Sequence, residues 1–312
     1  MEFNKDNSIE IEDIKDFITV AYVFIDDIYK HIAADKVKQR RNKDKALLSD
    51  SEIITIAVVG EAMGIDSEKA WYNYVKKNMK DLFPLLCERS RCNRLRRDLT
   101  GVIERIRVAL GSYLPFTGDR HRIIDSHPLP VCKFARATYC RFNGYEADYG
   151  YCASKKEHYF GYKVHALCTL QGYITDILVS PASVDDRHGV WELSERYEYP
   201  LTIIADKGYI GKLFIEELQN ERNITLIPIK KRNDKKPYSK RFRQLLYKLR
   251  RRIETSFSQF AFQFNGQRVL AKSLWGLKSR LLSKVLAFNL CFAINLCFDY
   301  QDNFASVKHL IF

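Results

Sequence analysis

A change of hydrophobic pattern near residue 119 limits the possible folds of this chain more than any other feature. Before that point apolar residues recur at helical spacing, whereas after it short β-branched runs alternate with helical patterns. The runs occupy residues 122–124, 159–170, 173–180, 202–205 and 225–229, and helices are expected at 190–197, 212–220 and 244–260. Gln171 and Gly172 predict a hairpin turn between the second and third runs. The order predicts an α/β domain with a mixed sheet, preceded by a helical domain.

We place the helical domain at residues 1–115, the α/β domain at 116–300 and a C-terminal tail at 301–312. In the helical domain, Ser49 and Glu52 form a capping-box pattern ahead of an apolar helix. One further helix is expected from Leu95 to Leu110, with arginines that include Arg94 and Arg97 at its start and on its opposite side. Such a helix suits a helix-turn-helix-like DNA-binding module. A helical bundle with a solvated basic face has the same pattern, and both interpretations stay open.

Positive charge is concentrated in one stretch of the chain. The formal net charge is +13, and residues 230–252 hold twelve Lys and Arg against one acid, Asp234. This basic segment, which begins with Lys230 and Lys231, favours a polyanionic partner. A solvated helix face is the alternative for such a run, and membrane surfaces are anionic as well.

The remaining composition bears on membranes, compartment and metals. The most apolar stretch, residues 285–298, is too short and too polar to span a bilayer, because it holds Asn289 and Asn295. Residues 1–16 show no signal-peptide pattern, and eight cysteines without one predict reduced thiols in the cytoplasm. Four residues could in principle bind zinc, but their spacing lacks tight cysteine pairs: Cys132, Cys140, Cys152 and His158. We expect free thiols there instead.

Three acidic residues stand in settings where a lone charge needs a partner. Asp125 and Asp206 each follow an apolar run, so we expect each at the end of a buried strand, and Glu254 lies on the basic helix. Two divalent cations held by carboxylates would supply that partner and would suit phosphoryl transfer. A turn cap or a salt bridge is the alternative for each one taken singly.

Other side chains near these acids are weaker candidates. His127 could orient a ligand or cap a turn before Pro128, and Lys207 could contact phosphate or pair with a carboxylate. Asp176, Asp185 and Asp186 are rival metal ligands, but their positions at or after the third run indicate turns.

The motifs around the three acids resemble one family. The runs 124–128, 204–209 and 252–259, together with 48–53 and the 95–110 helix, are similar to the IS982 family of insertion-sequence transposases. The resemblance implies an RNase H-like DDE catalytic domain. The wider group carries the pattern Y-x2-R-x3-E-x6-K, which Tyr247, Arg250 and Glu254 match. The lysine position falls on Ala261, so that element is missing and Arg268 or Lys272 is a possible substitute.

The resemblance also implies a chemistry and a set of partners. Asp125, Asp206 and Glu254 would hold two Mg²⁺ ions, with Mn²⁺ as a substitute, to cut DNA at the element's ends and join the 3′-hydroxyls to target DNA. DNA contacts are expected from Tyr247, Arg250, Arg251, Lys207, Lys230, Lys231, Arg94 and Arg97. The partners would be terminal inverted repeats and target DNA, bound by a homodimer or larger assembly in the bacterial cytoplasm, with no membrane. A metal-dependent nuclease on the same fold and a non-catalytic DNA-binding protein derived from a transposase remain alternatives.

Overall fold

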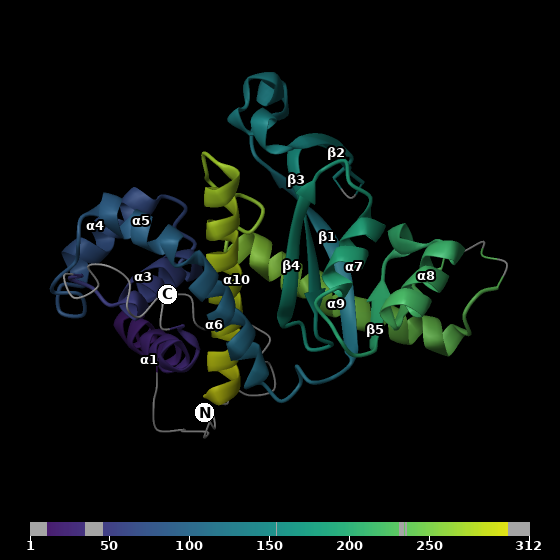
Figure 1. The fold of residues 1–312 in the computed structure, drawn as a ribbon, viewed down its shortest axis with the longest axis horizontal. Coiled ribbons are helices and arrows are strands. Elements are labelled where there is room, and N and C mark those ends of the chain that lie inside the picture. The colour runs from purple at the N-terminus through teal and green to yellow at the C-terminus, as the bar shows by residue number, and fades with distance from the viewer. Residues whose placement is uncertain (1–10, 35–45, 154, 231–233, 235, 299–312) are drawn as a thin grey trace. The chain divides into compact units, whose positions relative to one another are not determined.

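The chain divides into two compact units in a computed structural model that describes residues 11–34, 46–153, 155–230, 234 and 236–298 (Figure 1). The helical unit comprises Met1–Leu114, Phe260–Ala271 and Trp275–Phe312, and the sheet unit comprises Pro115–Gln259 and Lys272–Leu274. The first division falls where the hydrophobic pattern changes. The end of the sheet unit differs from the predicted domain end at residue 300, because the C-terminal helix belongs to the helical unit.

The helical unit is built from α-helices of 10 to 24 residues. They are α1 (Ile14–Ile32), α3 (Asp50–Ala62), α4 (Glu68–Asn78), α5 (Arg89–Asp98), α6 (Thr100–Ser112) and α10 (Leu274–Cys297). The predicted capping box is confirmed: the Ser49 hydroxyl accepts from Glu52 N, and the Glu52 carboxylate accepts from Ser49 N. The single helix expected from Leu95 to Leu110 is wrong, since α5 and α6 divide at Leu99. There the Thr100 hydroxyl donates to the Arg97 carbonyl, a local bond that competes with regular helical pairing.

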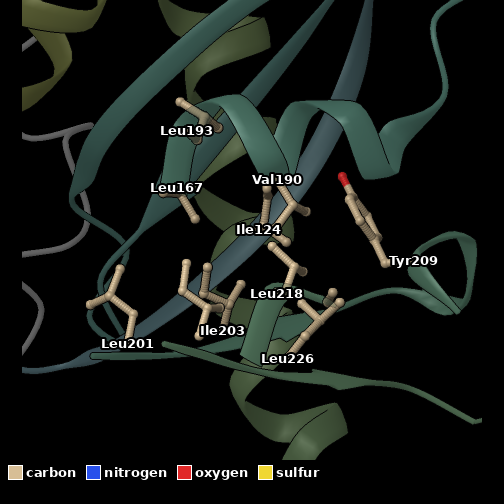
Figure 2. Close-up of a cluster of buried hydrophobic side chains, with 11 residues drawn as sticks. Ile124, Leu167, Val190, Leu193, Leu201, Ile203, Tyr209, Leu218 and Leu226 are labelled. Atoms are coloured by element: carbon tan, nitrogen blue, oxygen red, sulfur yellow. The ribbon is translucent and has the colours of Figure 1, made fainter. Parts of the chain in front are cut away.

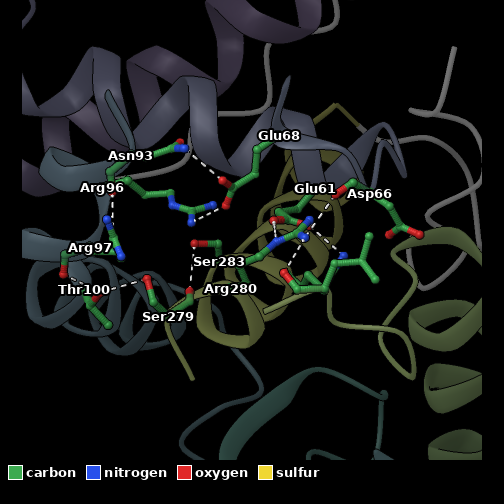
Figure 3. A network of polar contacts seen from close by, with 12 residues as sticks. Glu61, Asp66, Glu68, Asn93, Arg96, Arg97, Thr100, Ser279, Arg280 and Ser283 are labelled. Carbon is green, nitrogen blue, oxygen red and sulfur yellow. Dashed lines mark hydrogen bonds and ion pairs between the residues drawn. The ribbon is translucent and has the colours of Figure 1, made fainter. Parts of the chain in front are cut away.

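Helix α10 forms the core of the helical unit through an ion network (Figure 3). Arg280 and Lys284 both pair with Glu61 of α3, at 2.9 and 2.6 Å, and all three side chains are almost fully buried. The helix is longer than the apolar stretch seen in the sequence, and by length and composition it could cross a membrane. However, 89% of its apolar window is buried inside the protein, which is the pattern of a core helix.

The sheet unit contains one six-stranded mixed sheet. Its strands are β1 (His121–Pro130), β2 (Asp148–Cys152), β3 (Glu157–Cys168), β4 (Ile174–Pro181), β5 (Leu201–Ala205) and β6 (Ile224–Pro228). The order is β2-β3-β1-β5-β6, with β4 also paired to β3. Strand β3 pairs antiparallel with β1, β2 and β4, whereas β1, β5 and β6 run parallel. The predicted mixed sheet is therefore confirmed.

Helices cover both faces of the sheet (Figure 1). On one face α7 (Asp186–Ser194) and α8 (Lys212–Arg222) pack over an apolar core (Figure 2). Ile124 and Leu167 of the sheet meet Val190 of α7 and Leu218 of α8 there. Because alternate strand residues point to opposite faces, Asp125 points away from this core, toward α9 (Lys240–Gln263).

One expectation about the strands was wrong, and one strand was not predicted. The first strand does not end at Asp125 but continues to Pro130, since β3 pairs with it from Ile123 onward. The polar residues of β1 interrupt its apolar sequence pattern, but they do not interrupt its hydrogen-bonded pairing with β3. Strand β2 was not predicted, and neither were the 3-10 turns η2 (Phe134–Tyr139) and η3 (Arg141–Tyr145) before it. Strand β2 is short and only Cys152 of its five residues is buried, so no apolar run marks it in the sequence.

Candidate active site

The strand register brings Asp125 and Asp206 together. Ile123 of β1 lies beside Ile204 of β5 in the parallel pair, and two residues further along each chain the two aspartates are level. Asp206 follows the last residue of β5, as predicted, and opens the single turn η4 (Lys207–Tyr209). Both carboxylates therefore lie at the same level along neighbouring strands and on the same face of the sheet.

One guanidinium gathers all three predicted acids. Arg250 of α9 places its Nη2 3.1 Å from Asp125 Oδ2 and 3.5 Å from Glu254 Oε1, and its Nη1 2.9 Å from Asp206 Oδ1. Arg250 and Glu254 are four residues apart on the helix, so both face the sheet edge. Residues separated by up to 129 positions in the sequence thus converge on one point.

Asp125 is the most enclosed of the three acids. About 21% of its side chain is exposed, against 41% for Asp206 and 54% for Glu254. Burial raises the pKa of Asp125 to about 6, although the Arg250 charge and the hydrogen bond from Ser126 N act in the opposite direction. An opposite charge close to this carboxylate therefore stabilises its ionised form.

The three rival aspartates lie outside this cluster. Asp185 caps the N-terminus of α7, as expected of a turn residue, and pairs with Arg187. Asp176 pairs with Arg196 and accepts from the Tyr197 hydroxyl. Asp186, within the first turn of α7, contacts two strands of the sheet.

Asp186 ties α7 to the strands beneath the site, a role that the sequence analysis missed. Its Oδ1 accepts from the Ser126 hydroxyl and pairs with Lys163 of β3, both at 3.0 Å. Ser126 is adjacent to Asp125, so these bonds fix the backbone that carries the acid. The only sequence signal was an acidic residue at a helix start.

His127 does not cap a turn, because β1 runs through it. Its ring is buried and lies edge-on to Phe257 of α9, 4.8 Å between centroids. Burial lowers its pKa to about 4, so the ring is neutral near pH 7. This contact positions α9 over the sheet one turn beyond Glu254.

The predicted DNA-contacting residues lie in different settings. Tyr247 is 43% exposed on α9, and Arg251 and Lys207 are exposed as well. Lys230 lies over the Tyr238 ring and donates to the Lys236 carbonyl, whereas Lys231 falls outside the described residues. On α5 both Arg94 and Arg97 are exposed. Ala261, at the place of the missing lysine, is on the last turn of α9, and Arg268 pairs with Asp66.

Strand geometry separates the residues considered for zinc. Cys152 is buried with Tyr159 and Ala182, whereas His158 is exposed and pairs across the strands with Tyr151, on the opposite face. The cysteines in the described residues are free thiols. Burial raises the pKa of Cys132 to about 11, so it is a neutral thiol.

The acid cluster has the chemistry of a site for a hard divalent cation. Three carboxylates surround a point at which a positive charge already lies, and oxygen donors of this kind are what Mg²⁺ prefers. Across the described residues, no group of three or more His, Cys, Asp or Glu side chains is arranged as ready metal ligands.

Comparisons with known proteins bear on the fold and the family of the chain. No curated protein matches the sequence. A solved structure with a similar fold is the piggyBac transposase synaptic complex with hairpin DNA, determined by cryo-EM. It is 13% identical, has a TM-score of 0.50, and the match covers 96% of this chain and 80% of that one. A likeness at that identity shows the fold alone, and it agrees with the predicted RNase H-like domain. The family model for the transposase DDE domain matches residues 116–290, more than half of the sequence, so the chain belongs to that family.

Proposed function

We propose that this protein is an insertion-sequence transposase of the IS982 type, which cuts DNA at the ends of its element and joins the 3′-hydroxyls to target DNA. The observation that carries the proposal is the convergence of Asp125, Asp206 and Glu254 on the Arg250 guanidinium, in a chain of the transposase DDE domain family. The motifs that resemble IS982 members supply the narrower assignment.

Asp125, Asp206 and Glu254 are proposed to hold two Mg²⁺ ions, with Mn²⁺ as a substitute. When bound, the metals would activate the attacking oxygen and stabilise the leaving one in each in-line displacement. Asp125 suits the central position because β1 is paired on both sides and Ser126 N holds one carboxylate oxygen. Glu254 is the most exposed of the three and is the carboxylate best able to adjust to substrate.

Arg250 is proposed to exchange partners when DNA binds. In the DNA-free protein its guanidinium balances three acids, and a phosphate of the substrate offers a second anionic partner of matching bidentate geometry. The exposed Tyr247 and Arg251 on α9 would contact the same strand. Arg94 and Arg97 on α5 are proposed to contact the terminal repeats, with an assembly of two or more copies joining both ends of the element.

Catalysis can be tested with three isosteric variants and one matched control. Asp125→Asn, Asp206→Asn and Glu254→Gln should each abolish Mg²⁺-dependent cleavage of a duplex that carries the element's end, while duplex affinity is unchanged. Affinity depends on cations that contact phosphates, which these variants keep. Asp185→Asn, in the helix cap outside the cluster, should cleave normally. Retained cleavage by any of the three would remove that residue from the catalytic set.

The products distinguish this proposal from its two alternatives. A transposase should give strand-transfer products, in which the 3′-hydroxyl of the cut end is joined to a target plasmid. Cleavage without joining would indicate a nuclease on the same fold. Specific DNA binding without Mg²⁺- or Mn²⁺-dependent cleavage would indicate a DNA-binding protein derived from a transposase.

A further inference from the structure

The segment between β1 and β3 exposes an unusual set of aromatic side chains. We call residues 131–158 the aromatic excursion; it contains η2, η3 and β2. Tyr139 is 89% exposed, Tyr151 55% and Tyr149 48%, and Phe134 and Tyr145 are exposed as well. Rings left in water in such number on one segment mark an interaction surface.

The rings form an ordered platform rather than a scatter of mobile side chains. Tyr149 lies 5.1 Å from the ring of the buried Phe160 beneath it and 5.7 Å from Phe134. Tyr151 lies 4.9 Å from His158, its cross-strand neighbour. Rings fixed in this way lose little further freedom when a flat partner binds.

The excursion carries more positive than negative charge. Its exposed basic residues are Lys133, Arg136, Arg141, Lys155 and Lys156, against the acids Glu146, Asp148 and Glu157. Exposed aromatic rings among cations are the composition of surfaces that bind single-stranded nucleic acid, where bases stack on the rings and cations contact the backbone. An apolar protein partner would not require the cations.

The register connects this platform to the acid cluster. Asp125 lies opposite Ala166 of β3, and alternate residues along β3 lead to Phe160 and His158, which face Tyr149 and Tyr151 of β2. These residues therefore share one face of the sheet. From Ala166 to Phe160, which faces Tyr149, is six residues, about 20 Å at about 3.4 Å each, and to His158, which faces Tyr151, is eight residues, about 27 Å. Those lengths correspond to about six and eight stacked base pairs of DNA.

We propose that the aromatic excursion binds unpaired bases of the DNA substrate, stacking them on Tyr149 and Tyr151. The inference rests on the proposed function, since the occupant is the DNA whose phosphate lies at Asp125. It adds a second contact, about six to eight nucleotides from the acids, that recognises single-stranded or frayed DNA in preference to intact duplex.

The test compares two labelled DNAs by fluorescence anisotropy: an oligothymidine of about twelve nucleotides and a blunt duplex. The double variant Tyr149→Ala/Tyr151→Ala should bind the oligothymidine about tenfold or more weakly than wild type, because each stacked base contributes about that factor. Its affinity for the duplex should be unchanged. Tyr149→Phe/Tyr151→Phe keeps both rings and should bind as wild type does. Tyr199→Ala, an exposed tyrosine elsewhere in the sheet unit, is the matched control and should have no effect.

Several outcomes would overturn the inference. Equal oligothymidine affinity for wild type and the alanine variant would exclude stacking, and an equal loss in the phenylalanine variant would assign binding to the hydroxyls. A fall in self-association on sedimentation, with DNA affinity intact, would assign the platform to a second copy of the chain at the β2 edge. The same experiments distinguish a failure of this inference from a failure of the proposed function. Mg²⁺-dependent cleavage without tyrosine-dependent binding of the oligothymidine would contradict this inference alone. Tyrosine-dependent binding without cleavage would contradict only the proposed function.

Discussion

At the scale of single residues, Arg250 is the side chain on which the acid cluster depends. Its side chain is only 11% exposed, and its guanidinium contacts three carboxylates that would otherwise repel one another. Carboxylates can exchange a guanidinium for a divalent cation, because both supply positive charge. The same residue therefore stabilises the acid cluster and, under the proposed function, would compete with the metal.

This competition predicts that Arg250→Gln binds divalent cations more tightly in the absence of DNA. The variant removes a charge that the metal must otherwise displace, and we expect Mn²⁺ affinity at pH 8 to rise about tenfold, as for the loss of one close charge pair. Titration of free Mn²⁺ by electron paramagnetic resonance measures it directly. Arg251→Gln, an exposed neighbour on the same helix, should leave the affinity unchanged. Weaker binding by Arg250→Gln would show that the guanidinium helps to arrange the ligands.

At the scale of elements, the contact between α7 and β3 fixes the sheet face opposite the acids. Gly189 of α7 lies against the buried His165 of β3, and a Cβ at Gly189 would come within 2.4 Å of His165 Nδ1. His165 in turn shares a 2.9 Å hydrogen bond with the Ser180 hydroxyl of β4. Helix α7 can approach β3 this closely only because residue 189 has no side chain.

Gly189→Ala should accordingly destabilise the protein, by about 2–3 kcal/mol, because the added methyl forces α7 off the sheet. Helix propensity alone predicts the opposite, since alanine is favoured over glycine inside a helix by about 1 kcal/mol. Gly101→Ala in α6, where no atom lies within 4 Å of the new Cβ, provides the control and should be neutral or slightly stabilising. Urea unfolding followed by circular dichroism compares the two, and a Gly189→Ala protein as stable as wild type would contradict the close contact.

At the scale of the whole molecule, the chain returns to the helical unit after it has built the sheet. Glu61 of α3 is joined to Arg280 and Lys284 of α10, more than two hundred residues later. Burial alone would raise the pKa of Glu61, but the charges of Lys284 and Arg280 outweigh it and hold that pKa below its ordinary value. Removal of this carboxylate leaves two buried cations without their anion.

Two changes test the dependence of the helical unit on α10. Glu61→Gln should cost about 3–5 kcal/mol of unfolding free energy, the usual result of breaking a buried ion pair. A fragment of residues 1–114 lacks α10 altogether and should show no cooperative thermal transition by circular dichroism. A cooperative transition of the fragment, at a temperature close to that of the full chain, would show that the N-terminal helices fold alone.

The sequence alone determined the class of most of the longer elements and the identity of the candidate acids. Periodicity identified the mixed sheet and the basic helix. Asp125, Asp206 and Glu254 were recognisable because a carboxylate beside an apolar run or among arginines requires a compensating positive charge. Local patterns report local structure, and these features are local. The same local pattern gave a wrong strand end at Asp125, because cross-strand pairing with β3 extends β1 through polar residues.

Only the tertiary structure decided which distant side chains meet. The single guanidinium among the three acids, the Asp186 support beneath Ser126 and the return of α10 to Glu61 all join residues far apart in the chain. Such contacts depend on strand register and helix docking, which no stretch of sequence encodes by itself. The aromatic excursion was missed for a related reason: its strand has a single buried residue, and the strand takes its position from pairing with β3.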